Sequence, residues 1–379
     1  MVGEQSQSKS WVVHSPWIPL VFAVIILMSL GLSAIYSASQ SFQDSAYLIL
    51  RKQIIWLILS LFACVFVSQI NLDWLRKHAL LIYLLSVLGL VLVLIPGIGI
   101  KVNGAQRWLG LGPIRIQVSE FAKLGLVFSL SHYLAVNQRE IKSFWKGFLF
   151  PCILIGIVFA LIMKEPDYGT AFLSALVGMT LLFLAGCRLR FLMPCVLAGI
   201  AAFSALVYHD PVRIRRVISF LNVEENRTDS SYQLYQGIMA FQAGGINGVG
   251  LGQGRQQMSF LPEAHTDFIF AVIGEERGIL YTSGIVFIFL AIFLLLIFNA
   301  KRASNMFHYA LITGGCLLIV CQALINIGVV TGCLPTKGMS LPFISYGGSN
   351  LMVMFILIGL FINIFRSWNK PAISKPLEL

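Results

Sequence analysis

Ten long apolar runs dominate this sequence of 379 residues and constrain its fold more than any other feature. An α-helix needs about 20 predominantly apolar residues to cross a bilayer. Only 11% of the residues are charged, against roughly 25% in a typical soluble domain. The sequence therefore predicts an all-α polytopic membrane protein with about ten transmembrane helices, near residues 17–36, 54–70, 79–95, 118–136, 148–163, 168–185, 191–208, 278–298, 310–330 and 346–365.

The distribution of Lys and Arg predicts how these helices are oriented. If the N-terminus faces the cytoplasm, the cytoplasmic segments hold thirteen of these residues and the short outer loops hold seven, which is the expected bias. We therefore expect cytoplasmic tails at 1–16 and 366–379, a transmembrane domain over 17–365, and a large extracytoplasmic segment, 209–277, between spans 7 and 8. The net charge of +11 is spread over many short loops, so it does not indicate nucleic-acid binding.

The stretch 262–270 closes the polar extracytoplasmic segment and places Asp267 beside a short apolar run, FIFAVIG. Seven residues cannot cross a bilayer, and the charged residues 275–277 separate this run from the next full-length span. We expect Asp267 to lie at membrane-surface depth, on a segment that dips toward lipid without crossing. A carboxylate there is costly unless it is used or paired, so Asp267 is the first candidate catalytic residue.

The loop before the fourth span is rich in Gly and Pro, which predicts irregular backbone. Arg107 and Trp108 in this loop place a cation beside an amphipathic ring; they form either a binding site or a membrane anchor with a snorkelling arginine. Glu120 and Lys123 follow within an apolar run and share one helix face. They form either an internal ion pair that holds helices together or a functional polar site.

Two features of the long outer segment suggest ligand binding. Arg213, Arg215 and Arg216 lie within four residues, and such a cluster suits either a bound phosphate group or contact with lipid headgroups. The glycine-rich stretch 244–254 follows. It lacks the strand–helix context of a dinucleotide site, and we expect a loop that approaches a bulky ligand closely.

Further polar segments fall on the same outer side. Residues 335–349 contain two prolines and three glycines, which predict re-entrant backbone that lines a polar cavity, with Lys337 and Ser345 as candidate lining residues. Residues 164–170 predict a tight hairpin in which Asp167 caps the next helix. His265 with Glu263 and Asp267 is only a weak metal signature. Together these features predict an outward cavity for an amphipathic substrate with a phosphate head and a lipid tail.

The motifs together resemble the SEDS family of bacterial cell-wall polymerases, which includes FtsW, RodA and SpoVE. The resemblance extends over about residues 17–366 and is carried, in order, by NGAQRWLGLGPIRIQVSEFAKL, EPDYGTA, RIRR, YQLYQGIMAFQAGG, GLGQGRQQMSFLPEAHTDFIFAVIGEERG and PTKGMSLPFISYGGS. The sequences LPEAHTDFIFAVIGEE and PTKG are most similar to FtsW. Arg277 and Asn350 depart from the Leu and Ser expected in the family, which bears on the subtype.

This resemblance implies a peptidoglycan glycosyltransferase that polymerises lipid II and releases undecaprenyl pyrophosphate, for septal wall synthesis in cell division. Asp267 matches the essential aspartate and would be the general base that deprotonates the acceptor's 4-hydroxyl group. Glu120 and Lys123 match cavity-shaping positions. The candidates to hold pyrophosphate are the nearby cations Arg107, Arg213, Arg215, Arg216 and Lys337.

The resemblance also implies partners and a location. The partners would be lipid II, the nascent glycan strand, a class B penicillin-binding protein transpeptidase and other divisome proteins, at the cytoplasmic (inner) membrane. No cofactor is required by the motifs, and a need for a divalent cation stays open. The alternatives are an elongation-type polymerase resembling RodA, a lipid II flippase, or a scaffold without chemistry; a flippase needs no general base.

Overall fold

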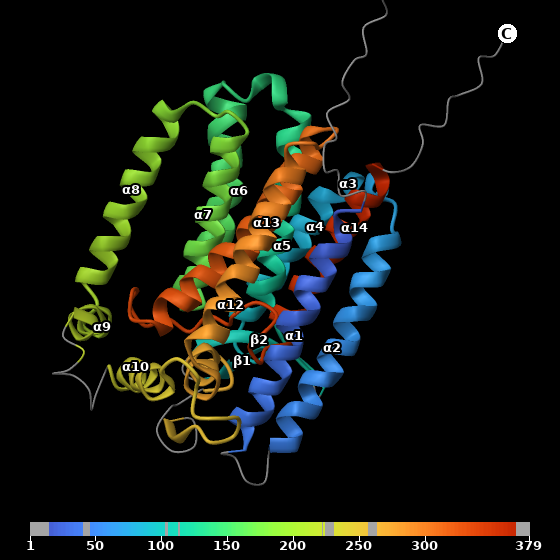
Figure 1. Ribbon diagram of the computed structural model, residues 1–379. Helices are drawn as coiled ribbons and strands as arrows, with labels where there is room; N and C mark the ends of the chain where they lie inside the picture. The colour runs from blue at the N-terminus through green and yellow to red at the C-terminus, as the bar shows by residue number, and fades with distance from the viewer. Residues whose placement is uncertain are drawn as a thin grey trace, which may run out of the picture.

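The computed structural model describes residues 15–40, 46–102, 105–112, 114–221, 223, 231–256 and 264–368. Helices form nearly all of it (Figure 1). They are α1 (Trp17–Ser39), α2 (Ala46–Gln69), α3 (Leu72–Lys77), α4 (Ala79–Leu94), α5 (Val118–Val136), α6 (Phe150–Lys164), α7 (Tyr168–Leu184), α8 (Leu189–Tyr208), α9 (Pro211–Leu221), α10 (Tyr232–Gly244), α12 (Ile269–Ala300), α13 (Met306–Val330) and α14 (Gly348–Trp368). A π-helical turn, Trp145–Leu149, leads into α6, and a 3₁₀ turn, Gln138–Glu140, follows α5.

Each of the ten predicted spans is occupied by a helix. Six helices, counting α6 with its π-helical turn, are long and apolar enough to cross a membrane, and three shorter apolar helices accompany them, Ala79–Leu94, Tyr168–Leu184 and Leu189–Ala205. The tenth, α5, has 19 residues and carries the buried Glu120 and Lys123. The chain is therefore a multi-pass helical membrane protein, as predicted. Much of the two predicted tails, 1–14 and 369–379, lies outside the described residues.

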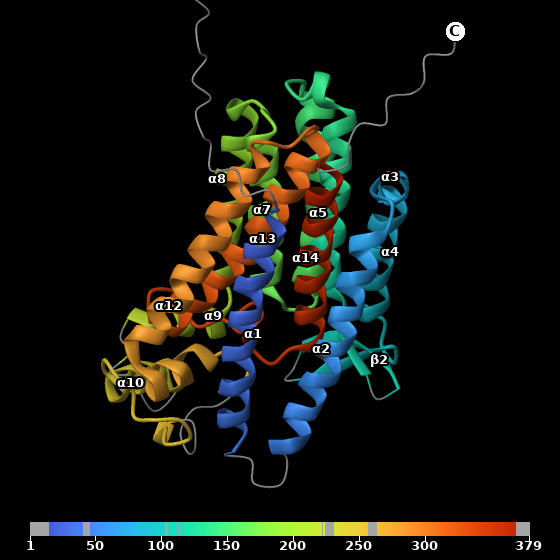
Figure 2. The same ribbon diagram turned by 45° about the vertical axis from the view of Figure 1, so that its right-hand side comes forward.

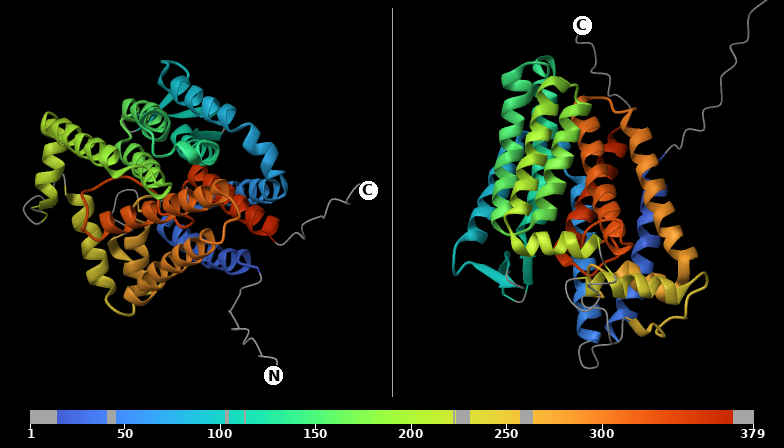
Figure 3. Two further views of the ribbon diagram at one scale, coloured as in Figure 1. Left: turned by 90° about the horizontal axis from the view of Figure 1, so that it is seen from above. Right: turned by 90° about the vertical axis from the view of Figure 1, so that its left-hand side faces the viewer.

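The core of the bundle is built around α13 and α14. Helix α13 packs against α5, α7 and α12, and α14 packs along the length of α2. Gly359 of α14 lies against the backbone of Cys64 in α2, and Asn363 donates hydrogen bonds to the carbonyl groups of Val67 and Ile70. Helix α8, by contrast, is splayed from the bundle and contacts mainly α9 and the end of α7 (Figures 1 and 3).

The polar segments gather at one end of the bundle (Figure 2). The loop that was predicted to be irregular instead forms a three-stranded antiparallel sheet, β1 (Gly99–Val102), β2 (Ala105–Leu111) and β3 (Ile114–Gln117). Of its described glycines, Gly112 lies at a turn, and Gly99 and Gly110 lie against neighbouring chain, so they do not prevent pairing. Helices α9 and α10 lie at the same end, whereas α1 begins and α14 ends at the opposite end (Figures 1 and 2).

Helix α12 is broken at Gly278, whose backbone angles are φ 75° and ψ −174°. The break separates the short apolar run from the full-length span, as the sequence indicated. The short run, however, does not face lipid: Ile269 to Ile273 form a helix that is buried within the protein. Phe270 packs against Phe241 of α10, so α10 covers this helix.

Two glycines of the glycine-rich stretch approach the chain itself closely, while its approach to a ligand stays a prediction. Gly244 and Gly248 lie against the backbone of residues 274–277, where a Cβ atom would clash. The amides of Val249 and Gly250 donate to the carbonyls of Glu275 and Glu276 at 2.9 and 3.0 Å. The glycines therefore dock this loop onto the break in α12.

Candidate active site

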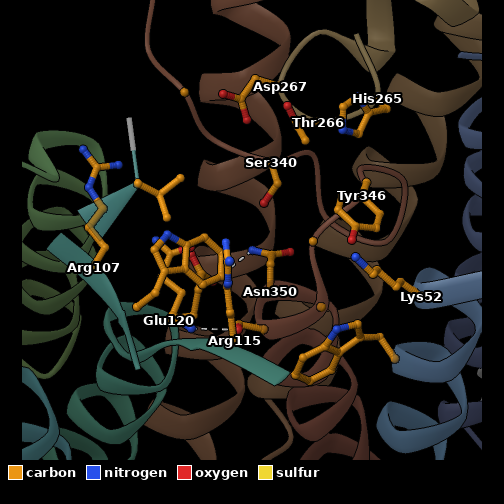
Figure 4. Close-up of a pocket in the computed structure, with 18 of the residues that line it drawn as sticks. Lys52, Arg107, Arg115, Glu120, His265, Thr266, Asp267, Ser340, Tyr346 and Asn350 are labelled. Atoms are coloured by element: carbon orange, nitrogen blue, oxygen red, sulfur yellow. Dashed lines mark hydrogen bonds between the residues drawn. The ribbon is translucent and has the colours of Figure 1, made fainter. Parts of the chain in front are cut away.

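A cavity of about 1060 Å³ opens among the polar segments at the end of the bundle that carries the sheet (Figure 4). Its wall combines parts of the chain that are distant in sequence: α2, the sheet, the start of α5, the α6–α7 hairpin, residues 265–267, α13 and the segment that leads into α14. In Figure 4, Asp267 and Thr266 lie on one side, Arg115, Glu120 and Asn350 on the opposite side, and Lys52 beside Tyr346.

Asp267 lies in the turn that precedes α12, between the buried residues Ala264 and Phe268, and it lines the cavity. Its backbone carbonyl accepts a hydrogen bond from Asn326 Nδ2 at 2.8 Å. Its carboxylate lies directly against Gly338, where a Cβ atom would be 2.5 Å from Asp267 Oδ2. The bundle thus presents the Asp267 carboxylate to the cavity, on a turn that contacts both α13 and residue 338.

Glu120 and Lys123 form a buried ion pair, with side-chain nitrogen and oxygen 3.0 Å apart. Lys123 is 1% and Glu120 5% exposed. Asn350 of α14 donates to Glu120 at 2.9 Å, and Lys123 donates to Gln322 of α13 at 2.9 Å. These contacts join three helices, and Glu120, Gln322 and Asn350 line the cavity while Lys123 lies behind it.

The hairpin between α6 and α7 forms another part of the wall. Arg107 of β2 donates to the carbonyl oxygens of Glu165 and Pro166 at 3.1 and 2.7 Å. Asp167 caps α7, as predicted, by accepting from Thr170 N at 3.3 Å, and Lys337 Nζ lies 3.9 Å from its carboxylate. Lys337 therefore neutralises Asp167, and Arg107 holds the hairpin.

Glu165 is the least expected group in this hairpin, because its carboxyl group is 0% exposed. Burial raises its pKa to about 8; the Asp167 carboxylate acts in the same direction and Arg107 opposes it. At neutral pH most of this group is the uncharged acid. Glu165 is thus a buried carboxyl group next to Asp167, which lines the cavity.

Three cations that the sequence suggested only as loop charges line the cavity: Arg51 and Lys52 of α2 and Arg115 of β3. Trp56 and Trp108 lie in the same wall, and the Trp56 ring packs on the backbone of Gly348. Cations that surround a wet cavity are suited to a phosphate group, and indole rings are suited to apolar faces of a ligand.

The predicted arginine cluster lies elsewhere. Arg213, Arg215 and Arg216 belong to α9, which contacts α8. Arg215 is exposed and is not among the described residues that line the cavity. The side chains of Arg213 and Arg216 lie outside the description. Among the described side chains, the cations in the cavity wall therefore include Arg51, Lys52 and Arg115 of α2 and the sheet, and the anion site on Arg213, Arg215 and Arg216 stays a prediction.

Two further predictions concern Ser345 as a lining residue and the weak metal signature at 263–267. The Ser345 hydroxyl accepts a hydrogen bond from Leu341 N at 2.7 Å and is buried, so it stabilises the turn before α14. Within the described ranges, no three His, Cys, Asp or Glu side chains are arranged to hold a metal ion, and Glu263 lies outside those ranges.

The sequence matches a known protein family and several of its members over most of its length. Residues 18–370 match the family described as cell cycle protein, which groups FtsW, RodA and SpoVE. The chain is 38% identical over 354 residues to the probable peptidoglycan glycosyltransferase FtsW of Trichlorobacter lovleyi, covering 91% of this chain and 92% of that protein. It is 35% identical over 356 residues to stage V sporulation protein E of Bacillus subtilis, covering 93% and 97%.

Solved structures show the same fold. The rod shape determining protein RodA of Thermus thermophilus superposes with a TM-score of 0.72 at 26% identity, covering 95% of this chain and 99% of that one. A chain from a structure titled for the coordination of polymerization and crosslinking by a peptidoglycan synthase complex superposes with a TM-score of 0.77 at 27% identity, covering 93% and 98%.

Proposed function

Because this chain belongs to the FtsW, RodA and SpoVE family, known as SEDS, we propose that the cavity is where it acts. The chain is a peptidoglycan glycosyltransferase, the activity named for its FtsW relatives. The proposal concerns what the cavity binds and which residues perform the reaction. Its main support is the position of Asp267, one carboxylate on an anchored turn facing the cations across the same cavity.

The substrate that suits this cavity is lipid II, which joins a disaccharide–peptide to a lipid through pyrophosphate. Arg51, Lys52 and Arg115 would hold the pyrophosphate of the donor, with Arg107 and Lys337 shaping the wall beside them. Cations at the position where negative charge develops stabilise a departing pyrophosphate more strongly than the bound ground state. The tail would remain in the bilayer while the sugars enter the cavity.

Asp267 would be the general base of glycosyl transfer. Its carboxylate takes the proton from the acceptor's 4-hydroxyl group as that oxygen attacks the donor's anomeric carbon. The bond from this carbon to the pyrophosphate oxygen breaks, undecaprenyl pyrophosphate leaves with the electron pair, and the anomeric configuration inverts from α to β. Positioned general bases contribute about 10²–10⁴-fold in rate.

The setting of the enzyme follows from the same proposal. The polar end that carries the cavity would face outward from the cytoplasmic (inner) membrane, with the start of α1 and the end of α14 at the cytoplasmic side (Figure 2). A cross-linking partner, a class B penicillin-binding protein, is supported by the related synthase complex. A role in septal synthesis, with divisome proteins, is supported by the description of the family as cell cycle protein.

Cysteine labelling tests the orientation. In a cysteine-free background, two exposed positions are suitable: Asn247, which follows α10, and Ser304, in the loop that joins α12 to α13. Helix α10 and the loop that joins α12 to α13 lie at opposite ends of the structure (Figure 1). An impermeant thiol reagent should label Asn247→Cys in intact cells and Ser304→Cys only after permeabilisation. The reverse pattern would place Asp267 on the cytoplasmic side and would contradict the proposal.

The catalytic test replaces Asp267 by Asn, which keeps size and most hydrogen bonding but cannot take a proton. Gel-resolved glycan chains should be lost while lipid II binding is retained, with the partner's transpeptidase blocked. Asp73→Asn is the matched control, because Asp73 is an exposed aspartate at the opposite end of the bundle. Wild-type chain synthesis by the Asp267 variant would refute the base role and leave only a structural role for this aspartate.

A further inference from the structure

The backbone between α13 and α14 is not helical where it passes the cavity, at residues 333–347. Non-helical backbone at membrane depth requires partners for its carbonyl groups. Two side chains one helical turn apart on α13 provide them. Gln322 donates to the carbonyl of Ser340 at 2.9 Å, and Asn326 donates to the carbonyl of Met339 at 2.6 Å.

Asn326 makes a second contact that Gln322 does not. The same Nδ2 atom donates to the carbonyl of Asp267 at 2.8 Å. Since a carbonyl oxygen only accepts hydrogen bonds, the amide must direct its two N–H groups at these two oxygens. Asn326 is 0% exposed, so water does not compete for this group. One side chain therefore joins two segments that are separated by about seventy residues.

These two segments also carry Asp267 and Gly338, which lie against each other. Asp267 Oδ2 lies where a Cβ atom of residue 338 would be 2.5 Å away, and Met339 is the next residue. The relative placement of the Asp267 and Met339 carbonyls therefore determines where the carboxylate lies in the cavity.

We propose that Asn326 is a positioning residue for glycosyl transfer: by holding the backbone of Asp267 and Met339 together, it fixes the Asp267 carboxylate at the point of proton abstraction. The inference rests on the proposed base role of Asp267. Misplacing a catalytic group by about 1 Å can cost about 10²-fold in rate. Loss of the amide should therefore lower kcat and leave substrate binding, which depends on the cations of α2 and β3, nearly unchanged.

The first test compares Asn326→Leu with Asn363→Leu. Asn363 also donates to two backbone carbonyls, at 2.9 and 2.7 Å, but at the far end of α2. The full chain is purified with its transpeptidase partner inactivated, and kcat and KM are measured with lipid II. Asn326→Leu should lower kcat by about 10²-fold with KM changed less than about threefold, whereas Asn363→Leu should retain wild-type kcat despite a similar loss of thermal stability. Equal kcat for the two variants would overturn the proposal.

A second variant displaces the Asp267 carboxylate without altering α13. Gly338→Ala places a methyl group against Asp267 Oδ2, and no unusual backbone angle at 338 opposes alanine. Gly156→Ala is its control, since open space surrounds Gly156. Gly338→Ala should also lower kcat more than KM, and combined with Asn326→Leu the loss should be smaller than the product of the two. Wild-type kcat in Gly338→Ala would overturn the proposal even if Asn326→Leu fails to fold.

Asp267→Asn, measured beside these variants, separates the two levels of inference. If it is inactive while Asn326→Leu and Gly338→Ala behave as wild type, only the positioning role fails. If it retains full activity, the base role fails and the positioning role fails with it.

Discussion

Replacing Lys123 by Met tests the buried ion pair that lies behind the cavity. The Lys123 ammonium is 3.0 Å from the Glu120 carboxylate and 2.9 Å from the Gln322 amide oxygen. Methionine fills a similar volume without a charge, so the change leaves little empty space. Its effect should therefore report on the uncompensated carboxylate of Glu120.

The structure gives the expected size of this effect. Removing one partner of a buried pair costs about 3–5 kcal/mol, because the remaining charge has no counterion. Here Asn350 still donates to Glu120 at 2.9 Å, and Glu120 lines the cavity, where solvent reaches it. Both features favour the lower end, about 3 kcal/mol. The double variant Glu120→Gln/Lys123→Met, which has no unpaired charge, should recover at least half of that loss.

The assay is equilibrium unfolding in mixed micelles titrated with denaturing detergent, followed by tryptophan fluorescence. Lys146→Met is the matched control, since Lys146 pairs with Glu140 at 2.9 Å on an exposed surface; exposed pairs contribute about 1 kcal/mol or less. The reasoning is refuted if Lys123→Met costs less than about 1 kcal/mol, or if the double variant is no more stable than the single one.

Other substitutions test the surroundings of the site. Glu165→Gln should flatten the pH dependence of the free energy of unfolding. The pKa of Glu165 is about 8 in the folded protein, above its ordinary value of 4.5, so the wild-type free energy of unfolding should fall by about 1.4 kcal/mol per pH unit between these values. Equal slopes for wild type and variant in unfolding titrations at pH 5 to 8.5 would contradict this. Gly278→Ala should destabilise by at least about 1–3 kcal/mol from backbone strain and further through its clash with the Ile246 carbonyl, measured by the same unfolding titration. Arg115→Gln should weaken lipid II binding about tenfold or more, as expected for the loss of a charged contact of about 1.5–3 kcal/mol. Arg215→Gln should leave binding unchanged. Equal binding by both variants in a pull-down with labelled lipid II would contradict the role of Arg115 and favour the arginine cluster on α9.

The helices could be predicted from the sequence because the bilayer imposes one rule on every span. Residues 118–136 match α5, and the separation of the short run from the span at Gly278 was visible because seven apolar residues cannot cross. The sheet was missed because Gly and Pro were taken to oppose pairing, although the strand segments themselves contain alternating apolar and polar residues, as in IKV and IRIQ.

The candidate site was predicted in part. Asp267, Arg107, Trp108 and Glu120 line the cavity, because they belong to dense polar motifs that a membrane protein cannot leave in lipid. The cations of α2 were missed because two charges at the start of a span usually mark only its boundary. Asn326 was also missed, since a lone amide within an apolar helix gives no sign of which backbone it contacts; only the packed structure brings it to residues 267 and 339.

The packing of α2 along α14 determines when the cavity can be completed during synthesis of the chain. Asn363 reaches back across 296 residues to Val67, and ribosomes add about 5–20 residues per second. Helix α2, which supplies one wall of the cavity, therefore waits in the membrane for about 15–60 s before its main packing partner, α14, is made. A chain that stops before α14 has inserted most of its spans but has no completed cavity, so such fragments would reside in the membrane without the ability to act on any substrate.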